Sequence, residues 1–274
     1  MSDAEMQLMI MKANVYNLAG EERGAIELPA VFSEPVRSDL ITRAVLAEES
    51  KTYQPKGAYK WAGLETSAEY RGRKEEYGSI KNKGISRLPR EKLPKGRYGK
   101  VKRVPFAVKG RRAHPPKPEK ILVEKINERE RQKAIRSALA ATANKEIVKE
   151  RGHLVDAVKS YPIVIENAFE ALSKTKDVVS VLSKLGFSSD MLRARRNSKR
   201  RSGVMANRRG GTYRPRSVLV IVGEDKGIVK GARNISGVDV VPVEKLSACL
   251  LAPGTHAGRI AVYSEGAIEK LKKW

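Results

Sequence analysis

One long stretch, Lys51 to Pro118, constrains the fold more than any other part of the chain. Its 68 residues show no sustained apolar period, and they contain 20 Lys and Arg against 5 Glu, with 8 Gly and 7 Pro. A connection of that length is rare inside a compact domain and is usually functional or disordered. It also holds seven of the chain's 15 aromatic residues, whereas a disordered tether is poor in aromatics. Cations with interleaved rings favour a segment that orders against nucleic acid. A solvated linker is the alternative.

The net charge of +24 is concentrated in two segments. Lys51–Pro118 carries +15, and Met191–Gly223 holds ten Lys and Arg with no acid, which leaves −1 for the rest of the chain. A nearly neutral body with two cationic segments is typical of a protein that binds a polyanion.

Several classes of protein are excluded by what the sequence lacks. A single cysteine excludes an internal disulfide, and three isolated histidines lack the spacing of metal ligands, so we expect neither a metal nor a cofactor. No apolar run is long enough to cross a membrane, and the first residues do not resemble a signal peptide. We therefore expect a soluble, intracellular protein that does not contact membranes, with residues 1–10 as a loose, disordered extension.

The remaining segments alternate between strand and helix patterns. Apolar runs predict strands at 12–18, 161–165, 217–222, 238–241 and 259–263, with an extended crossing at 26–32. Helical spacing predicts helices at 38–50, 127–144, 145–151, 166–172, 175–185, 189–198, 226–234, 243–246 and 264–273. Asn127 and Glu130 resemble a capping box, Ser264 caps the last helix, and 202–216 is a second loop.

This pattern predicts an α/β fold, a three-layer α/β/α Rossmann-like domain with a mainly parallel sheet and a long extended basic loop. Residues 11–50 and 119–274 form the globular body, and 51–118 form the loop inserted in it.

The turns that follow the strands lack the motifs of a nucleotide enzyme. Gly20–Gly24 and Gly223–Gly227 match neither the dinucleotide-binding nor the P-loop pattern, and we find no catalytic triad. The chain is therefore not predicted to be an enzyme. A basic α/β RNA-modifying enzyme, such as a methyltransferase, is the alternative, and a non-specific DNA binder is a third possibility.

Six strings occur in an order typical of one family. They are PVRSDLI at 35–41, AGLETSAE at 62–69, GRRAHPPK at 110–117, SALAATA at 137–143, ARNISG at 232–237 and LAPG at 251–254. The chain resembles the archaeal and eukaryotic form of the universal L-four family of large-subunit ribosomal proteins. The resemblance begins near Met11, and the end of the chain shortly after the last helix favours the archaeal form. Residues 75–97 contain no matching string.

The resemblance implies a structural protein of the large subunit in the cytoplasmic ribosome, bound early in assembly to the 5′ region of the large-subunit rRNA. The inserted loop would reach the wall of the nascent-peptide exit tunnel and form a constriction there with large-subunit protein twenty-two. Other large-subunit proteins would contact the globular body.

The candidate RNA-binding residues lie in the two basic segments. In the first they are Lys56, Lys60, Arg71, Arg73, Lys74, Arg97, Lys100, Lys102, Arg103, Lys109, Arg111, Arg112 and His114. In the second they are Arg195, Arg196, Arg200, Arg201, Arg208, Arg209, Tyr213, Arg214 and Arg216. Candidates for base stacking are Tyr53, Tyr59, Trp61, Tyr70 and Tyr98.

Some of these assignments have alternatives. Arg71, Arg73 and Lys74 are the residues we place nearest the tunnel. Trp61 either stacks on RNA or packs on its own loop, and His114 either bonds RNA or makes a local turn contact. The cations at 193–201 could also be an ordinary solvated helix face.

Overall fold

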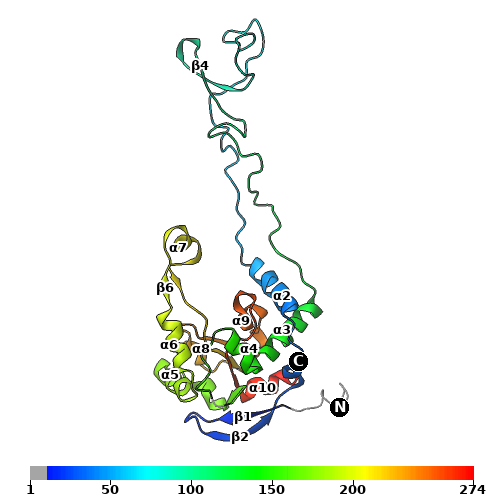
Figure 1. Ribbon diagram of the computed structural model, residues 1–274, viewed down its shortest axis with the longest axis vertical. Helices are drawn as coiled ribbons and strands as arrows, with labels where there is room; N and C mark the ends of the chain where they lie inside the picture. Colours follow the sequence, from blue (N-terminus) through cyan, green and yellow to red (C-terminus); the bar gives the residue numbers. More distant parts are fainter. Residues whose placement is uncertain (1–10, 159) are drawn as a thin grey trace. The chain divides into compact units, whose positions relative to one another are not determined.

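The computed structural model describes residues 11–158 and 160–274, so the predicted extension at 1–10 lies outside it (Figure 1). The chain forms two compact units. The larger contains the chain up to Thr52 together with Val123–Trp274, and the smaller is Tyr53–Leu122. The sequence had placed the inserted segment at 51–118, close to the span of the smaller unit.

A six-stranded sheet organises the larger unit, in the order β2-β1-β5-β10-β8-β9. The strands are β1 (Lys12–Tyr16), β2 (Glu22–Glu27), β5 (Ile163–Ile165), β8 (Leu219–Val222), β9 (Asp239–Pro242) and β10 (Ala261–Ser264). All neighbouring pairs are parallel except β1 and β2, which are antiparallel. The prediction of an α/β fold with a mainly parallel sheet is confirmed.

Both faces of this sheet are buried, which explains the continuous apolar runs of its strands. Successive residues of a strand point to opposite faces. Accordingly, Leu219 and Ile221 of β8 belong to one buried cluster, and Val220 and Val222 belong to a second. Helices cover each cluster, so the larger unit has three layers.

The helices divide between the two clusters according to their apolar stripes. The first cluster takes residues from α2 (Ser38–Ser50), α3 (Glu128–Ala143), α9 (Ala248–Leu251) and α10 (Glu265–Leu271). The second takes residues from α4 (Lys145–Glu150), α5 (Thr175–Lys184), α6 (Ser188–Arg196) and α8 (Ile228–Ala232). Ser264 caps α10 as predicted, by accepting a hydrogen bond from the Ala267 amide at 3.1 Å.

Some local predictions were wrong. Asn127 precedes α3 but makes no side-chain cap bond, and Glu130 instead pairs with Arg43 at 2.9 Å. The predicted helices at 166–172 and 243–246 are short 3-10 turns, Asn167–Ala171 and Val243–Lys245. The extended crossing at 26–32 is the end of β2 followed by a 3-10 turn, Ala30–Ser33, because Phe32 and Val31 turn inward to the core.

Candidate nucleic-acid interface

In the smaller unit, the first and last segments run side by side with little space between their backbones. The Ala58 amide donates to the Pro116 carbonyl at 3.1 Å. A Cβ at Gly63, whose φ is +77°, would lie 2.5 Å from the carbonyl carbon of Gly110. Glycine is needed here both for the positive φ and for the close approach. Backbone contacts thus order this pair of segments without an apolar core.

Residues 68–103 contain regular structure that the sequence analysis missed. The strands β3 (Arg90–Lys92) and β4 (Tyr98–Val101) form an antiparallel hairpin, and Glu69 bridges to Arg90. Ala68 and Ile80 are buried at 1% and 4% exposure. The sequence analysis described 51–118 only as an extended loop, because backbone pairing and a very small core do not produce an apolar period.

Most predicted RNA contacts of the smaller unit lie exposed on this framework. Arg71 and Lys102 are half-buried, and the other eleven candidates are exposed. Arg71 donates to the Tyr77 carbonyl at 2.9 Å, and its Nε lies 3.7 Å from a carboxylate oxygen of Glu69. Arg103 donates to the Ala68 carbonyl at 3.1 Å. Lys56, Arg112 and His114 come together around a hollow of about 810 Å³.

The stacking candidates differ in how far their rings are available. Tyr53, Tyr59, Trp61 and Tyr70 are about half exposed or more. The Lys60 ammonium lies 5.9 Å from the centroid of the Trp61 ring. Tyr98 is half-buried and donates its hydroxyl to the Ser79 carbonyl at 2.6 Å.

The second basic segment is also ordered, whereas the sequence analysis predicted a loop at 202–216. The strands β6 (Lys199–Arg200) and β7 (Thr212–Tyr213) pair antiparallel, with α7 (Gly203–Arg209) between them. Arg201 donates from its amide to Gly211 at 2.7 Å and lies over the Tyr213 ring at 5.8 Å. Arg195, Arg196, Arg200, Arg208, Tyr213, Arg214 and Arg216 are exposed, Arg201 is half-buried, and the side chain of Arg209 lies outside the described part.

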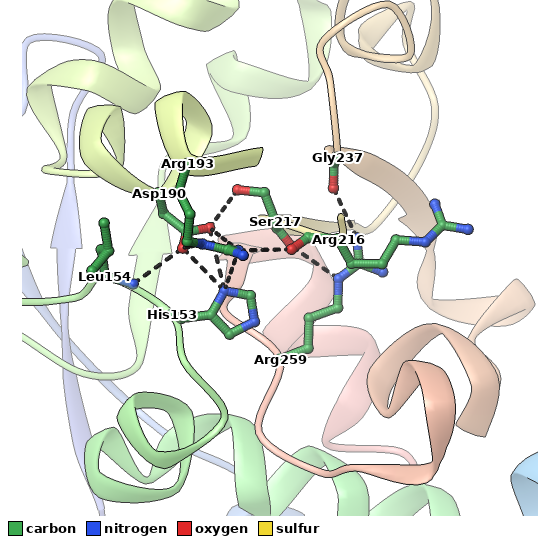
Figure 2. A network of polar contacts seen from close by, with 8 residues as sticks. All are labelled: His153, Leu154, Asp190, Arg193, Arg216, Ser217, Gly237 and Arg259. Carbon is green, nitrogen blue, oxygen red and sulfur yellow. Dashed lines mark hydrogen bonds and ion pairs between the residues drawn. The ribbon is translucent and has the colours of Figure 1, made fainter. Parts of the chain in front are cut away.

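A buried polar network holds both ends of this segment, at Arg193 and at Arg216 and Ser217, against the rest of the larger unit (Figure 2). The fully buried Asp190 accepts from Arg193 Nε at 2.8 Å and from the Ser217 hydroxyl at 2.5 Å. It also accepts from the Leu154 amide at 3.1 Å, and His153 Nδ1 lies 3.2 Å away. Burial alone raises a carboxyl pKa, but these hydrogen bonds hold the pKa of Asp190 well below its usual range.

The network continues through a second carboxylate. Asp239 accepts from Arg216 at 2.9 Å and from Arg259, which is completely buried, at 2.6 Å. Arg259 also donates to the carbonyl of Ser217 at 2.9 Å. Two cations of the second basic segment, Arg193 and Arg216, therefore pair with acids that lie outside Met191–Gly223. Arg216 remains half exposed, so its predicted contact with RNA stays a prediction.

Comparison with known proteins decides which family has this fold and these basic segments. Residues 26–274 match the model of the ribosomal protein L4/L1 family. The chain belongs to that family. This confirms the resemblance that the sequence motifs indicated.

Curated relatives within the family match almost the whole chain. The large ribosomal subunit protein uL4 of Methanocaldococcus jannaschii is 49% identical over 264 residues, which covers 96% of this chain and 99% of the relative. The uL4 proteins of Methanococcus vannielii and Archaeoglobus fulgidus are 48% and 45% identical, with the same coverage.

Membership of the family settles the question of catalysis. A ribosomal L4/L1 protein is structural and not an enzyme, so the alternative of an RNA-modifying enzyme was wrong. Within residues 11–158 and 160–274, no helix is long and apolar enough to cross a membrane. The same residues contain no His, Cys, Asp and Glu cluster that could hold a metal ion.

Sequence reasoning missed the polar residues that position the second basic segment. His153 and Asp190 are 37 residues apart, and Arg259 is 42 residues from Ser217, so the sequence does not show that these residues meet. The available signal was weak: Asp190 and Arg193 are one helical turn apart, and Arg259 lies two residues before the strand β10.

Proposed function

We propose that this chain is a structural constituent of the large ribosomal subunit in the cytoplasm, and that its two basic segments bind large-subunit rRNA. One observation carries the proposal: exposed cations crowd onto segments that have little apolar core of their own. Segments of this kind gain binding free energy when their cations contact phosphates, because counterions are released from the RNA on binding. The half-exposed rings of the smaller unit supply stacking surfaces for unpaired bases.

The finer assignments extend this proposal along the family resemblance. The RNA partner is the 5′ region of the large-subunit rRNA, bound early in assembly. The smaller unit reaches the wall of the peptide exit tunnel and meets large-subunit protein twenty-two there. Arg71, Arg73 and Lys74 are its residues nearest the tunnel, and other large-subunit proteins contact the larger unit.

The salt dependence of RNA binding tests the role of the smaller unit. Affinity of the full chain for a 5′ fragment of the rRNA is measured over a range of salt concentrations. Replacing Lys100, Arg103, Arg111 and Arg112 by Gln should make the log–log slope shallower by roughly 3, since each phosphate contact contributes about 0.7 to 0.9.

Four exposed cations of the larger unit provide the matched control: Lys176, Lys184, Arg233 and Lys272. Their replacement by Gln should leave the slope nearly unchanged. Equal slopes for both quadruple variants would contradict a specific RNA interface on the smaller unit. Equal competition by duplex DNA would instead favour a non-specific nucleic-acid binder.

A photo-crosslinking amino acid at Arg73 tests the tunnel assignment. In assembled ribosomes that carry a stalled nascent chain, the crosslinker should capture that chain, whereas the same group at Lys176 should not. Equal crosslinking from both positions, or none from Arg73, would remove the tunnel assignment but leave rRNA binding untouched.

A further inference from the structure

A hollow of about 460 Å³ in the larger unit has walls rich in guanidinium groups. Arg151 lies at the end of α4, Arg193 in α6, and Arg201, Arg214 and Arg216 in the second basic segment. Neither Arg151 nor Arg193 was among the predicted RNA contacts. The hollow thus brings this basic segment together with Arg151, which precedes its first residue, Met191, by 40 residues.

The cations around this hollow outnumber the carboxylates beside them. Asp190 pairs with Arg193, and Asp239 is shared between Arg216 and Arg259. Within the described part of the chain, no acid forms an ion pair with Arg151 or Arg214. Arg151 instead donates to the Pro253 carbonyl at 2.6 Å, which orients its guanidinium without neutralising it.

The electrostatic consequence is visible at Arg151. Burial, together with the nearby charges of Arg259 and Arg193, lowers the pKa of Arg151 to about 10. The group stays charged at neutral pH, but in a surplus of positive charge. An anion entering the hollow would relieve this repulsion, and the planar fork of an arginine suits a phosphate especially well.

Two arginines of the wall, Arg151 and Arg193, are held in place before any ligand arrives. Figure 2 shows Arg193 fixed between Asp190 and the Arg216 carbonyl, to which its Nη2 donates at 2.9 Å. Gly152 and Gly254, both with positive φ, leave part of the wall without side chains, and no heavy atom beyond their adjoining residues lies within 4 Å of where their Cβ atoms would be. Donors that are already oriented lose little freedom on binding.

We propose that this hollow binds one phosphate group of the RNA backbone, with Arg151 and Arg214 as its principal donors. The inference rests on the proposed binding of rRNA and adds a defined anchoring point on the larger unit. The chemistry recognised is a phosphate oxyanion, which either an RNA phosphodiester or free inorganic phosphate could supply.

Ethylation interference on the rRNA fragment tests the RNA source. With the full wild-type chain, ethylation of particular phosphates should block binding. One of these interference positions should disappear in both Arg151→Gln and Arg214→Gln, and affinity should fall roughly tenfold, as for a lost charged hydrogen bond. Arg129→Gln, which changes an exposed arginine of α3, is the matched control and should keep every position.

Thermal unfolding tests free inorganic phosphate, the second source, separately from RNA. Inorganic phosphate should raise the Tm of the wild type more than chloride of equal ionic strength, and the two variants should lose this difference. A phosphate effect on Tm without any lost interference position would overturn RNA as the source and support free phosphate.

If both variants keep every interference position and also keep the extra rise in Tm with phosphate, the phosphate site is overturned. Wild-type RNA binding, and with it the proposed function, would still stand. Arg214 is exposed and makes no ion pair within the described residues, so Arg214→Gln remains a valid test even if Arg151→Gln fails to fold. Failure of the wild type itself to bind the RNA would instead remove the proposed function.

Discussion

At the scale of single residues, Asp190 has the clearest consequence for stability. It is buried and accepts hydrogen bonds from Arg193, Ser217 and the Leu154 amide. Removing one partner of a buried charge network leaves the others unsatisfied, so Asp190→Asn should lower the free energy of unfolding at pH 7 by about 3 kcal/mol. Chemical denaturation of the variant and the wild type measures this difference.

The pH dependence supplies a second readout. The folded-state pKa of Asp190 lies below its ordinary value near 3.8, so its contribution is fully present above that pH and is lost as the pH falls further. Burial also lowers the pKa of His153 below 6.5, so acidification below that value costs stability in both proteins. The wild type should therefore lose more stability than Asp190→Asn below pH 4. Asp156→Asn, at a residue whose side chain is 78% exposed, should match the wild type; parallel curves for Asp190→Asn would contradict the role of the buried carboxylate.

At the scale of elements, burial decides what the sequence could predict. The strands β5, β8 and β10 are buried on both faces and appear as apolar runs, and α2, α3 and α5 show clear apolar stripes. The edge strand β2 is largely exposed and reads ERGAIE, so it lacks an apolar pattern. The hairpins β3–β4 and β6–β7 are polar and pair through their backbones, which no periodicity reveals.

The same reasoning applies to the candidate interface. Charge counting located both basic segments because it needs no knowledge of which residues meet. The hollow around Arg151 could not be found in this way, since it depends on contacts between residues as far apart as Arg151 and Pro253. The acids that pair with Arg193 and Arg216 beside this hollow, Asp190 and Asp239, likewise lie outside the second basic segment.

At the scale of the whole molecule, the core and the first basic segment should be separable. Both buried clusters consist entirely of residues outside Tyr53–Leu122. Gly57 and Pro118 lie so close that a Cβ on Gly57 would come within 2.8 Å of the proline ring. Deleting 57–115 and joining the ends with a short Gly-Ser linker should therefore leave a cooperative unfolding transition, with a Tm within a few degrees of the wild type.

The deletion also provides its own probe, because it removes Trp61 and leaves Trp274 as the remaining tryptophan. Trp274 is tied to α3, since Arg136 donates to its carbonyl at 2.6 Å. Its fluorescence and the far-UV circular dichroism should change together on heating, as in a two-state transition. RNA affinity should fall and its salt slope become shallower, while binding through the second basic segment persists. A broad, non-cooperative melt would mean that the larger unit needs the first basic segment in order to fold, which would contradict the prediction that it folds independently.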